Sequence, residues 1–143
     1  MSPPRPSPRV RAVIALDTNV VVRYLAQDDA RQSALATRLI EQRLTKAAPG
    51  FISLVALLET VWVMESAYGA DASTVASIVA DLLDSAALEV QDSAAVSDAL
   101  VLYRGGSVDL HDRLMVSLAA RRGAKTLTFD VKASRRLGME LLK

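Results

Sequence analysis

The segment Ala12 to Asn19 is a short apolar run, rich in β-branched residues, that ends abruptly in the carboxylate of Asp17. Such a run predicts a buried strand that delivers one charged side chain to the end of a sheet. Ligands bind at the carboxyl ends of strands in open α/β sheets, which favours a functional role for Asp17. The alternative is a structural role, because Asp is also a common N-cap of a following helix.

The composition is that of one globular domain in which helices cover a sheet. Of the 143 residues, 51% are hydrophobic but only 4% are aromatic, which argues against a disordered or an all-β chain. The absence of cysteine excludes disulfides, zinc–thiolate sites and a cysteine nucleophile. Any metal must therefore bind oxygen ligands or the single histidine, His111.

Residues 1–11 are rich in proline and arginine, so a disordered tail is expected ahead of one domain at residues 12–143. This tail lacks the apolar core of a secretory signal. No apolar run in the chain approaches the ~20 residues that span a bilayer. We therefore expect a cytoplasmic protein that does not associate with a membrane.

Charge is distributed unevenly along the chain. Residues 1–50 carry eight Lys or Arg against four acids, whereas residues 51–100 carry eight acids and no Lys or Arg. Residues 101–143 carry nine basic residues against four acids. One interpretation is that these charged residues simply lie on solvent-exposed faces of the domain. The other is a basic rim around an acidic centre, which would attract a phosphate backbone.

Apolar strands alternate with amphipathic helices along the whole chain. Strands are expected at residues 13–16, 50–53, 88–91, 125–130 and 139–142. Helices are expected at residues 19–25, 35–44, 54–68, 71–83, 93–103, 109–121 and 133–137. This alternation predicts an α/β fold, a single domain with a central parallel sheet flanked by helices on both faces.

The helix expected at residues 54–68 is apolar around most of its circumference. Its residues Val55, Leu58, Trp62 and Val63 cannot all face the core of one domain, so we expect a second polypeptide to cover part of it. The alternative is a helix buried on both sides by this chain's own sheet and helices. Glu59 lies within this run, where burial of an unpaired carboxylate is costly.

Acidic residues follow several of the expected strands. Asp17 and Asp130 each end a strand, and Glu59 lies early in the helix after the second strand. Asp109 and Asp112 are three residues apart and share a helix face. Because parallel strands end at one edge of a sheet, we expect these carboxylates to converge. Such a cluster needs a cation, for which oxygen ligands favour Mg²⁺ or Mn²⁺, and it suits phosphodiester hydrolysis.

Each of these acids also has a structural alternative. Asp130 can cap the helix that follows it, as Asp17 can. Asp109 can be an N-cap with Asp112 as its capping-box partner. Glu59 can be a buried structural carboxylate, although the acidic block around it contains no Lys or Arg to pair with it.

Four segments occur in a fixed order along the chain: Leu16-Asp17-Thr18-Asn19, the spacing from Ser53 to Glu59, Asp109-Leu110-His111-Asp112, and Leu127-Thr128-Phe129-Asp130. Together they resemble a PIN-domain nuclease, and most closely a VapC-type toxin of a bacterial or archaeal toxin–antitoxin pair. The resemblance covers residues 13–142. No single segment is specific, but the four in this order and spacing are.

The resemblance implies a metal-dependent endoribonuclease that uses Mg²⁺ or Mn²⁺. Its acidic quartet would be Asp17, Glu59, Asp112 and Asp130, with Asp109 as an auxiliary metal ligand. Thr18 or Asn19, together with Thr128, would orient these carboxylates or the attacking water without binding the metal themselves. The resemblance also implies two candidate partners, a small cognate antitoxin and a second copy of the chain.

Basic residues near the end of the chain are the candidates for binding the RNA backbone. They are Arg104, Arg121, Arg122, Lys132, Arg135 and Arg136. His111 and Arg113 depart from the family pattern, which usually has small residues beside the acid at Asp112. We expect both to point away from the Asp112 face, and an ordinary surface role is the simpler interpretation of His111.

Three other functions fit parts of the sequence. A phosphotransferase also places an Asp after its first strand, but the haloacid-dehalogenase kind needs a second Asp where this chain has Asn19. The receiver kind needs a Lys where this chain has Asp130. A binding module without catalysis would be expected to have lost an acid. An RNA-processing nuclease without an antitoxin is the nearest alternative.

Overall fold

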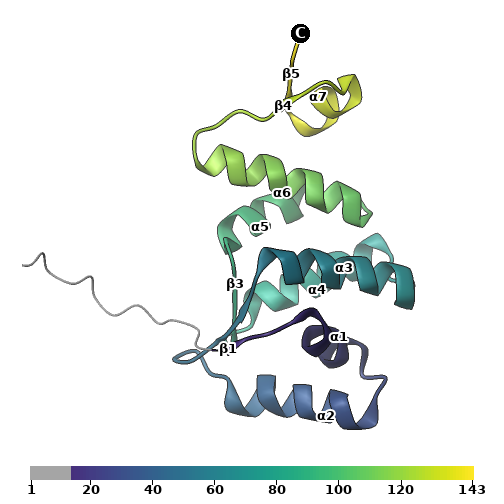
Figure 1. The fold of residues 1–143 in the computed structure, drawn as a ribbon, viewed down its shortest axis with the longest axis vertical. Coiled ribbons are helices and arrows are strands. Elements are labelled where there is room, and N and C mark those ends of the chain that lie inside the picture. The colour runs from purple at the N-terminus through teal and green to yellow at the C-terminus, as the bar shows by residue number, and fades with distance from the viewer. Residues whose placement is uncertain (1–13) are drawn as a thin grey trace, which may run out of the picture.

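The structure is a computed structural model that describes residues 14–143 (Figure 1). The expected tail at residues 1–11 lies outside the described residues. Helices and strands alternate, and each of the strand pairs is parallel, so the predicted α/β fold is confirmed. None of the described helices is long and apolar enough to cross a membrane.

The elements follow the order expected from the sequence. The strands are β1 Ile14–Ala15, β2 Gly50–Ile52, β3 Leu88–Val90, β4 Leu127–Thr128 and β5 Glu140–Leu141. The helices are α1 Thr18–Ala26, α2 Ala30–Arg38 with a π-helical turn η1 Leu39–Arg43, α3 Leu54–Tyr68, α4 Ala72–Asp84, α5 Ser93–Leu102, α6 Ser107–Arg121 and α7 Val131–Leu137. Helix α6 begins earlier than expected, because Gly106 rather than Asp109 occupies its N-cap position.

Strand β2 is the centre of a three-stranded sheet with β1 and β3 on either side. Its first residue, Gly50, pairs with Ile14 of β1 and with Leu88 of β3. The side chain of Leu44 packs directly over this glycine, where an added Cβ would lie 2.6 Å from the Leu44 Cδ1 atom. A larger residue at position 50 would therefore require the end of the Leu44 side chain to shift.

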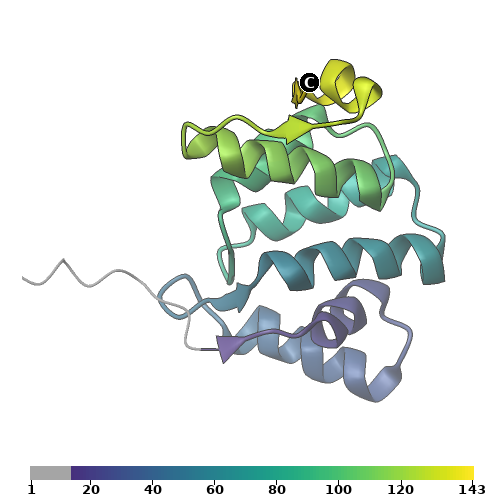
Figure 2. The ribbon, with the colours of Figure 1, turned by 45° about the horizontal axis from the view of Figure 1, so that its top comes forward.

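Strands β4 and β5 form a separate two-stranded sheet, with Leu127 opposite Glu140. In Figures 1 and 2 this sheet and α7 lie at the opposite end of the molecule from β1, with α5 and α6 between them. The strands expected to end at one shared edge therefore end in two places. This separation decides where the acidic residues lie.

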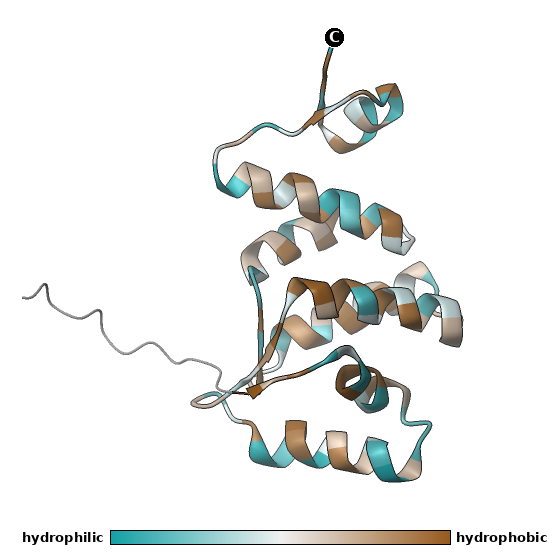
Figure 3. Cartoon of the chain, viewed as in Figure 1, coloured by the Kyte–Doolittle hydropathy of each residue, from teal (hydrophilic) through white to brown (hydrophobic). Residues whose placement is uncertain are grey.

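Helix α3 has one face in the core and another in solvent. Leu57, Thr60 and Val61 are buried against the rest of the domain, whereas Val55 is 76% exposed and Trp62 is 58% exposed. Figure 3 shows hydrophobic residues along much of this helix. The prediction that one domain cannot bury all of its apolar residues is confirmed, because the core covers only one side.

A buried ion pair holds the start of α6. Asp109 and Arg113 are both buried, and the Arg113 Nε donates to Asp109 Oδ2 at 3.0 Å. The backbone N–H of Arg104 donates to the same oxygen at 2.8 Å, and Arg136 of α7 lies 3.4 Å from the other oxygen. Burial alone would raise the pKa of Asp109, but these donors together lower it below its ordinary value.

Replacing Asp109 with asparagine is expected to destabilise the fold by about 3 kcal/mol, because it leaves the buried Arg113 without a counter-charge. Because folding lowers the pKa of Asp109, the stabilisation from its charge is fully present above the ordinary carboxyl pKa of 3.8. This stabilisation is lost as the pH falls through the lower pKa that Asp109 has in the folded state. The stability gap between wild type and variant should therefore narrow in acid. Urea unfolding of both proteins, at neutral pH and below pH 4, measures this difference in the free energy of unfolding.

Asp98→Asn is the matched control, because Asp98 also pairs with an arginine, Arg121, but on the exposed surface. Exposed pairs contribute little to stability, so this variant should unfold close to wild type at both pH values. Equal stabilities of the Asp109 and Asp98 variants would show that the buried pair does not stabilise the fold.

Candidate active site

Asp17 directly follows β1 and caps α1. Its side chain is exposed, and one carboxylate oxygen accepts from the Val20 N–H at 3.0 Å. The capping role considered from the sequence is therefore present, and the exposed side chain remains open to a ligand. A pocket of about 420 Å³ opens beside Asp17 and is lined by Asn19, Arg23 and Arg43 among others.

Glu59 lies on the solvent side of α3, not in the core as its apolar neighbours suggested. It is exposed because the turn of the helix points Leu57 and Val61 inward instead. A groove of about 310 Å³ between α3 and the start of α6 is lined by Glu59, together with Leu58, Trp62, Ser107, Val108 and His111. Burial therefore imposes no cost on the Glu59 charge.

Asp112 lies in α6 and is half-buried. The His111 Nδ1 atom lies 3.8 Å from Asp112 Oδ1, and His111 itself is exposed. Arg113 turns away from Asp112 and toward Asp109. The groove beside Glu59 thus brings the imidazole of His111 on α6 to the same surface as the Glu59 carboxylate on α3.

Asp109 differs from its expected role as an auxiliary metal ligand. Both of its oxygens are engaged, one by Arg136 and the other by Arg113 and the Arg104 N–H. The arginines already compensate its charge, so this carboxylate is not available to a cation here. It is a structural residue that joins α6 to α7.

Asp130 directly follows β4 and caps α7. One oxygen accepts from the N–H of Lys132 at 2.8 Å and of Ala133 at 3.2 Å. The Thr128 hydroxyl accepts from the Asp130 N–H at 3.0 Å, so Thr128 orients the backbone at this acid. Asp130 is exposed, and β4, which it follows, lies far from β1 in Figure 1.

The predicted convergence of the acids does not occur within one copy of the chain. Asp17, Glu59 and Asp112 offer the carboxylate oxygens that Mg²⁺ prefers. Among residues 14–143, however, no group of three or more His, Asp or Glu side chains lies close enough to hold a metal ion. The donor types fit magnesium and their arrangement does not, because Asp17 and Asp130 end strands of separate sheets.

The basic residues predicted to bind RNA are all exposed, and two of them pair with acids. Arg121 makes two hydrogen bonds to Asp98, at 2.8 and 3.1 Å, and Arg136 pairs with Asp109. The other four, which are all exposed, are Arg104, Arg122, Lys132 and Arg135.

Two arginines were missed by sequence reasoning. Arg23 and Arg43 line the pocket beside Asp17 because α1 packs against α2, which the turn η1 continues. Their spacing from Asp17 in the sequence gives no indication of this proximity. By contrast, the pair of Asp109 and Arg113 could have been found from its i, i+4 spacing on one helix.

The structure brings a PIN-like order of elements together with acids at the ends of β1 and β4 and on helices α3 and α6. The family model described as the PIN domain matches residues 14–137, a range that includes Asp17, Glu59, Asp112 and Asp130. No curated protein matches the chain. PIN domains are typically metal-dependent nucleases and generally use Mg²⁺. Since the match spans most of its length, the chain belongs to the PIN domain family.

Proposed function

We propose that this protein is an endoribonuclease that hydrolyses RNA phosphodiester bonds with Mg²⁺ or Mn²⁺, and that it is the VapC-type toxin of a type II toxin–antitoxin pair. The observation that carries the proposal is the family match over residues 14–137 with all four acids retained within it, Asp17, Glu59, Asp112 and Asp130. A chain that kept the fold only to bind a partner would have no need of all four.

Positive charge near Asp17 and Asp130 supports a nucleic-acid substrate. Arg43 and Arg23 line the pocket beside Asp17, whose floor is apolar, and Arg23 also pairs with Asp28 at 2.8 Å. Lys132 and Arg135 are exposed on α7 close to Asp130 in the sequence. Guanidinium groups beside an apolar floor suit a phosphate and its attached base.

The groove between α3 and α6 supports the toxin–antitoxin part of the proposal. Leu58, Trp62 and Val108 line its apolar part, and Glu59 and His111 line its polar part. An exposed apolar groove of this kind is typical of an interaction surface. A small antitoxin with an apolar segment and a basic side chain would cover Trp62 and pair with Glu59.

Asp17→Asn is expected to abolish RNA cleavage, because it removes a carboxylate charge and keeps the shape of the side chain. Loss of one electrostatic group in an active site typically lowers the rate by roughly 10²–10³-fold. The measurement is cleavage of single-stranded RNA with Mg²⁺ or Mn²⁺, after EDTA treatment, and after the metal is restored. Wild type should lose activity in EDTA and regain it with metal.

Asp71→Asn is a closely matched control. Asp71 caps α4 through the Thr74 N–H at 2.8 Å, as Asp17 caps α1 through the Val20 N–H at 3.0 Å. Asparagine is also a good N-cap, so both variants should fold. Asp71→Asn should cleave like wild type, and cleavage by Asp17→Asn at that same rate would remove Asp17 from the active site.

Replacing both Lys132 and Arg135 with glutamine should weaken RNA binding and its salt dependence. Each phosphate contact that is lost should reduce the slope of log K against log salt by roughly 0.7 for a single strand. The measurement is fluorescence anisotropy of labelled RNA with the Asp17→Asn protein over a KCl series. Arg121→Gln, which changes an arginine already paired with Asp98, should keep the wild-type slope. An unchanged slope in the double variant would place α7 away from the RNA.

Trp62 offers a direct test of the antitoxin groove, because it is the only tryptophan in the chain. Adding the product of the adjacent small reading frame should shift its fluorescence to the blue as water leaves the ring. Val108→Asp, within the groove, should prevent this shift. Val101→Asp, on an exposed residue outside the groove, should not. An unshifted spectrum with wild type would argue against an antitoxin at this surface.

A further inference from the structure

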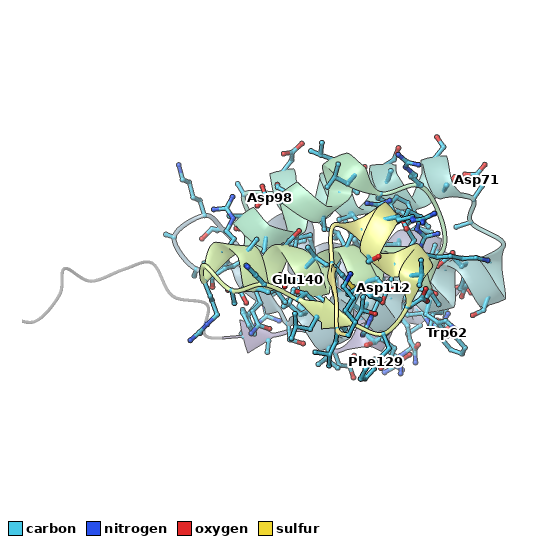
Figure 4. The ribbon with its side chains drawn as sticks, turned by 90° about the horizontal axis from the view of Figure 1, so that it is seen from above. Trp62, Asp71, Asp98, Asp112, Phe129 and Glu140 are labelled. Carbon is cyan, nitrogen blue, oxygen red and sulfur yellow. The ribbon has the colours of Figure 1, made fainter. Side chains whose placement is uncertain are left out.

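A second pocket, of about 400 Å³, lies where the end of α5, the middle of α6 and the end of α7 meet. None of the acids Asp17, Glu59, Asp112 and Asp130 lines it. In Figure 4, which looks onto the end of the molecule that α7 forms, α7 lies over α6. Cavities of this size are typical of small-molecule sites.

Three arginines from three different segments line this pocket. Arg104 follows α5, Arg113 lies in α6 and Arg136 lies in α7. No acid lines the pocket, and the buried Asp109 beside it compensates only part of the three positive charges. Because a guanidinium group does not lose its proton in a protein, the pocket keeps a net positive charge that suits an anion.

Arg113 has a hydrogen-bond donor without an acceptor. The residue is only 5% exposed, and among residues 14–143 its Nη2 atom is buried with no hydrogen-bond partner. Its bond from Nε to Asp109 uses one of the five N–H donors of a guanidinium group. Buried donors in native proteins almost always have a partner. An anion in the pocket would supply the missing acceptor.

The other two guanidinium groups are available to a ligand. The Arg104 side chain is exposed and forms no ion pair with the described part of the chain, since its contact with Asp109 is through the backbone N–H. The Arg136 side chain is 53% exposed, and its Nη2 lies 3.4 Å from Asp109 Oδ1, longer than a strong charge-assisted hydrogen bond. Both groups can therefore turn toward an anion while Arg113 keeps its bond to Asp109.

The same pocket has an apolar wall. Val101 is 84% exposed and Leu102 is 59% exposed, and both line the pocket beside Tyr103. The Tyr103 hydroxyl accepts from the Gly106 N–H at 3.0 Å, which holds the ring in place. Apolar surface next to the arginines indicates a ligand that carries an apolar or aromatic part as well as its charged group.

We propose that this pocket binds a small phosphate monoester with an aromatic base, of the nucleoside monophosphate class. A terminal phosphate carries a charge of about −1.5 to −2 at pH 7 and three strong acceptor oxygens, so it can accept from all three arginines. A carboxylate has two oxygens and a single charge, and matches them less well. A shift of the exposed Arg136 side chain lets a phosphate oxygen reach Nη2 of Arg113.

The base lies against Val101, Leu102 and Tyr103. The inference goes beyond the proposed nuclease function and does not depend on it, because the acids of that site do not line this pocket.

Titration calorimetry with three probes tests which parts of the ligand are recognised. The probes are adenosine monophosphate (AMP), inorganic phosphate and adenosine, each added to the full chain in EDTA so that no divalent cation can carry phosphate to the acidic residues. AMP should bind with one site per chain. Inorganic phosphate should bind more weakly, because it lacks the base, and adenosine should not bind, because it lacks the phosphate.

Arg104→Gln tests where AMP binds. It removes one guanidinium group and leaves the pair of Arg113 and Asp109 intact, and it should weaken AMP binding roughly tenfold or more, because hydrogen bonds between charged groups are the strong ones. Arg38→Gln is the matched control. It removes the same charge from an exposed arginine of α2, at the opposite end of the molecule from α7 in Figure 1, and should bind AMP like wild type.

Val101→Asp is a second test that changes no arginine. It places a negative charge on the exposed wall of the pocket and should also weaken AMP binding, because the phosphate is repelled.

Four results would overturn the proposal. They are the absence of saturable AMP binding, adenosine that binds as tightly as AMP, and equal weakening of AMP binding by Arg38→Gln and Arg104→Gln. The fourth is loss of AMP binding in Arg43→Gln but not in Arg104→Gln, which would place the nucleotide in the pocket beside Asp17. RNA cleavage is not a readout in any of these measurements, so failure of the nuclease function would leave their outcome unchanged.

Discussion

The position of β2 between β1 and β3 is the constraint on which the rest of the domain depends. Strand β2 is hydrogen-bonded to both of the other strands of the sheet, and along the chain it follows the turn η1 and leads directly into α3. Gly50 allows Leu44 to pack over the first pair of this sheet. The same pairing fixes the end of β1, and therefore the position from which Asp17 projects.

A second constraint is the buried charge of Asp109. A carboxylate without partners would not be tolerated at this depth. Two guanidinium groups and one backbone N–H supply its partners, and one of those groups comes from α7. The acid that looked like a metal ligand thereby holds the C-terminal segment against α6. Charge compensation therefore contributes to the contact between α6 and α7.

Local sequence patterns predicted most of the fold. The apolar spacing from Leu54 and the glycine at 69 predicted α3 at its observed bounds, with Gly69 in the left-handed conformation after it. The position of β4 could not be predicted this way, because it depends on Arg136 and Asp109, residues far apart in the sequence. The exposure of Glu59 was not predicted, because a helix with apolar residues all around it does not show from its sequence which face is buried.

The separation of Asp17 from Asp130 also has an electrostatic consequence. Carboxylates brought close together without a cation repel one another, and one of them must then take up a proton. A single copy avoids this cost, because each acid is exposed and caps its own helix. A divalent cation held between two such carboxylates would relieve the repulsion.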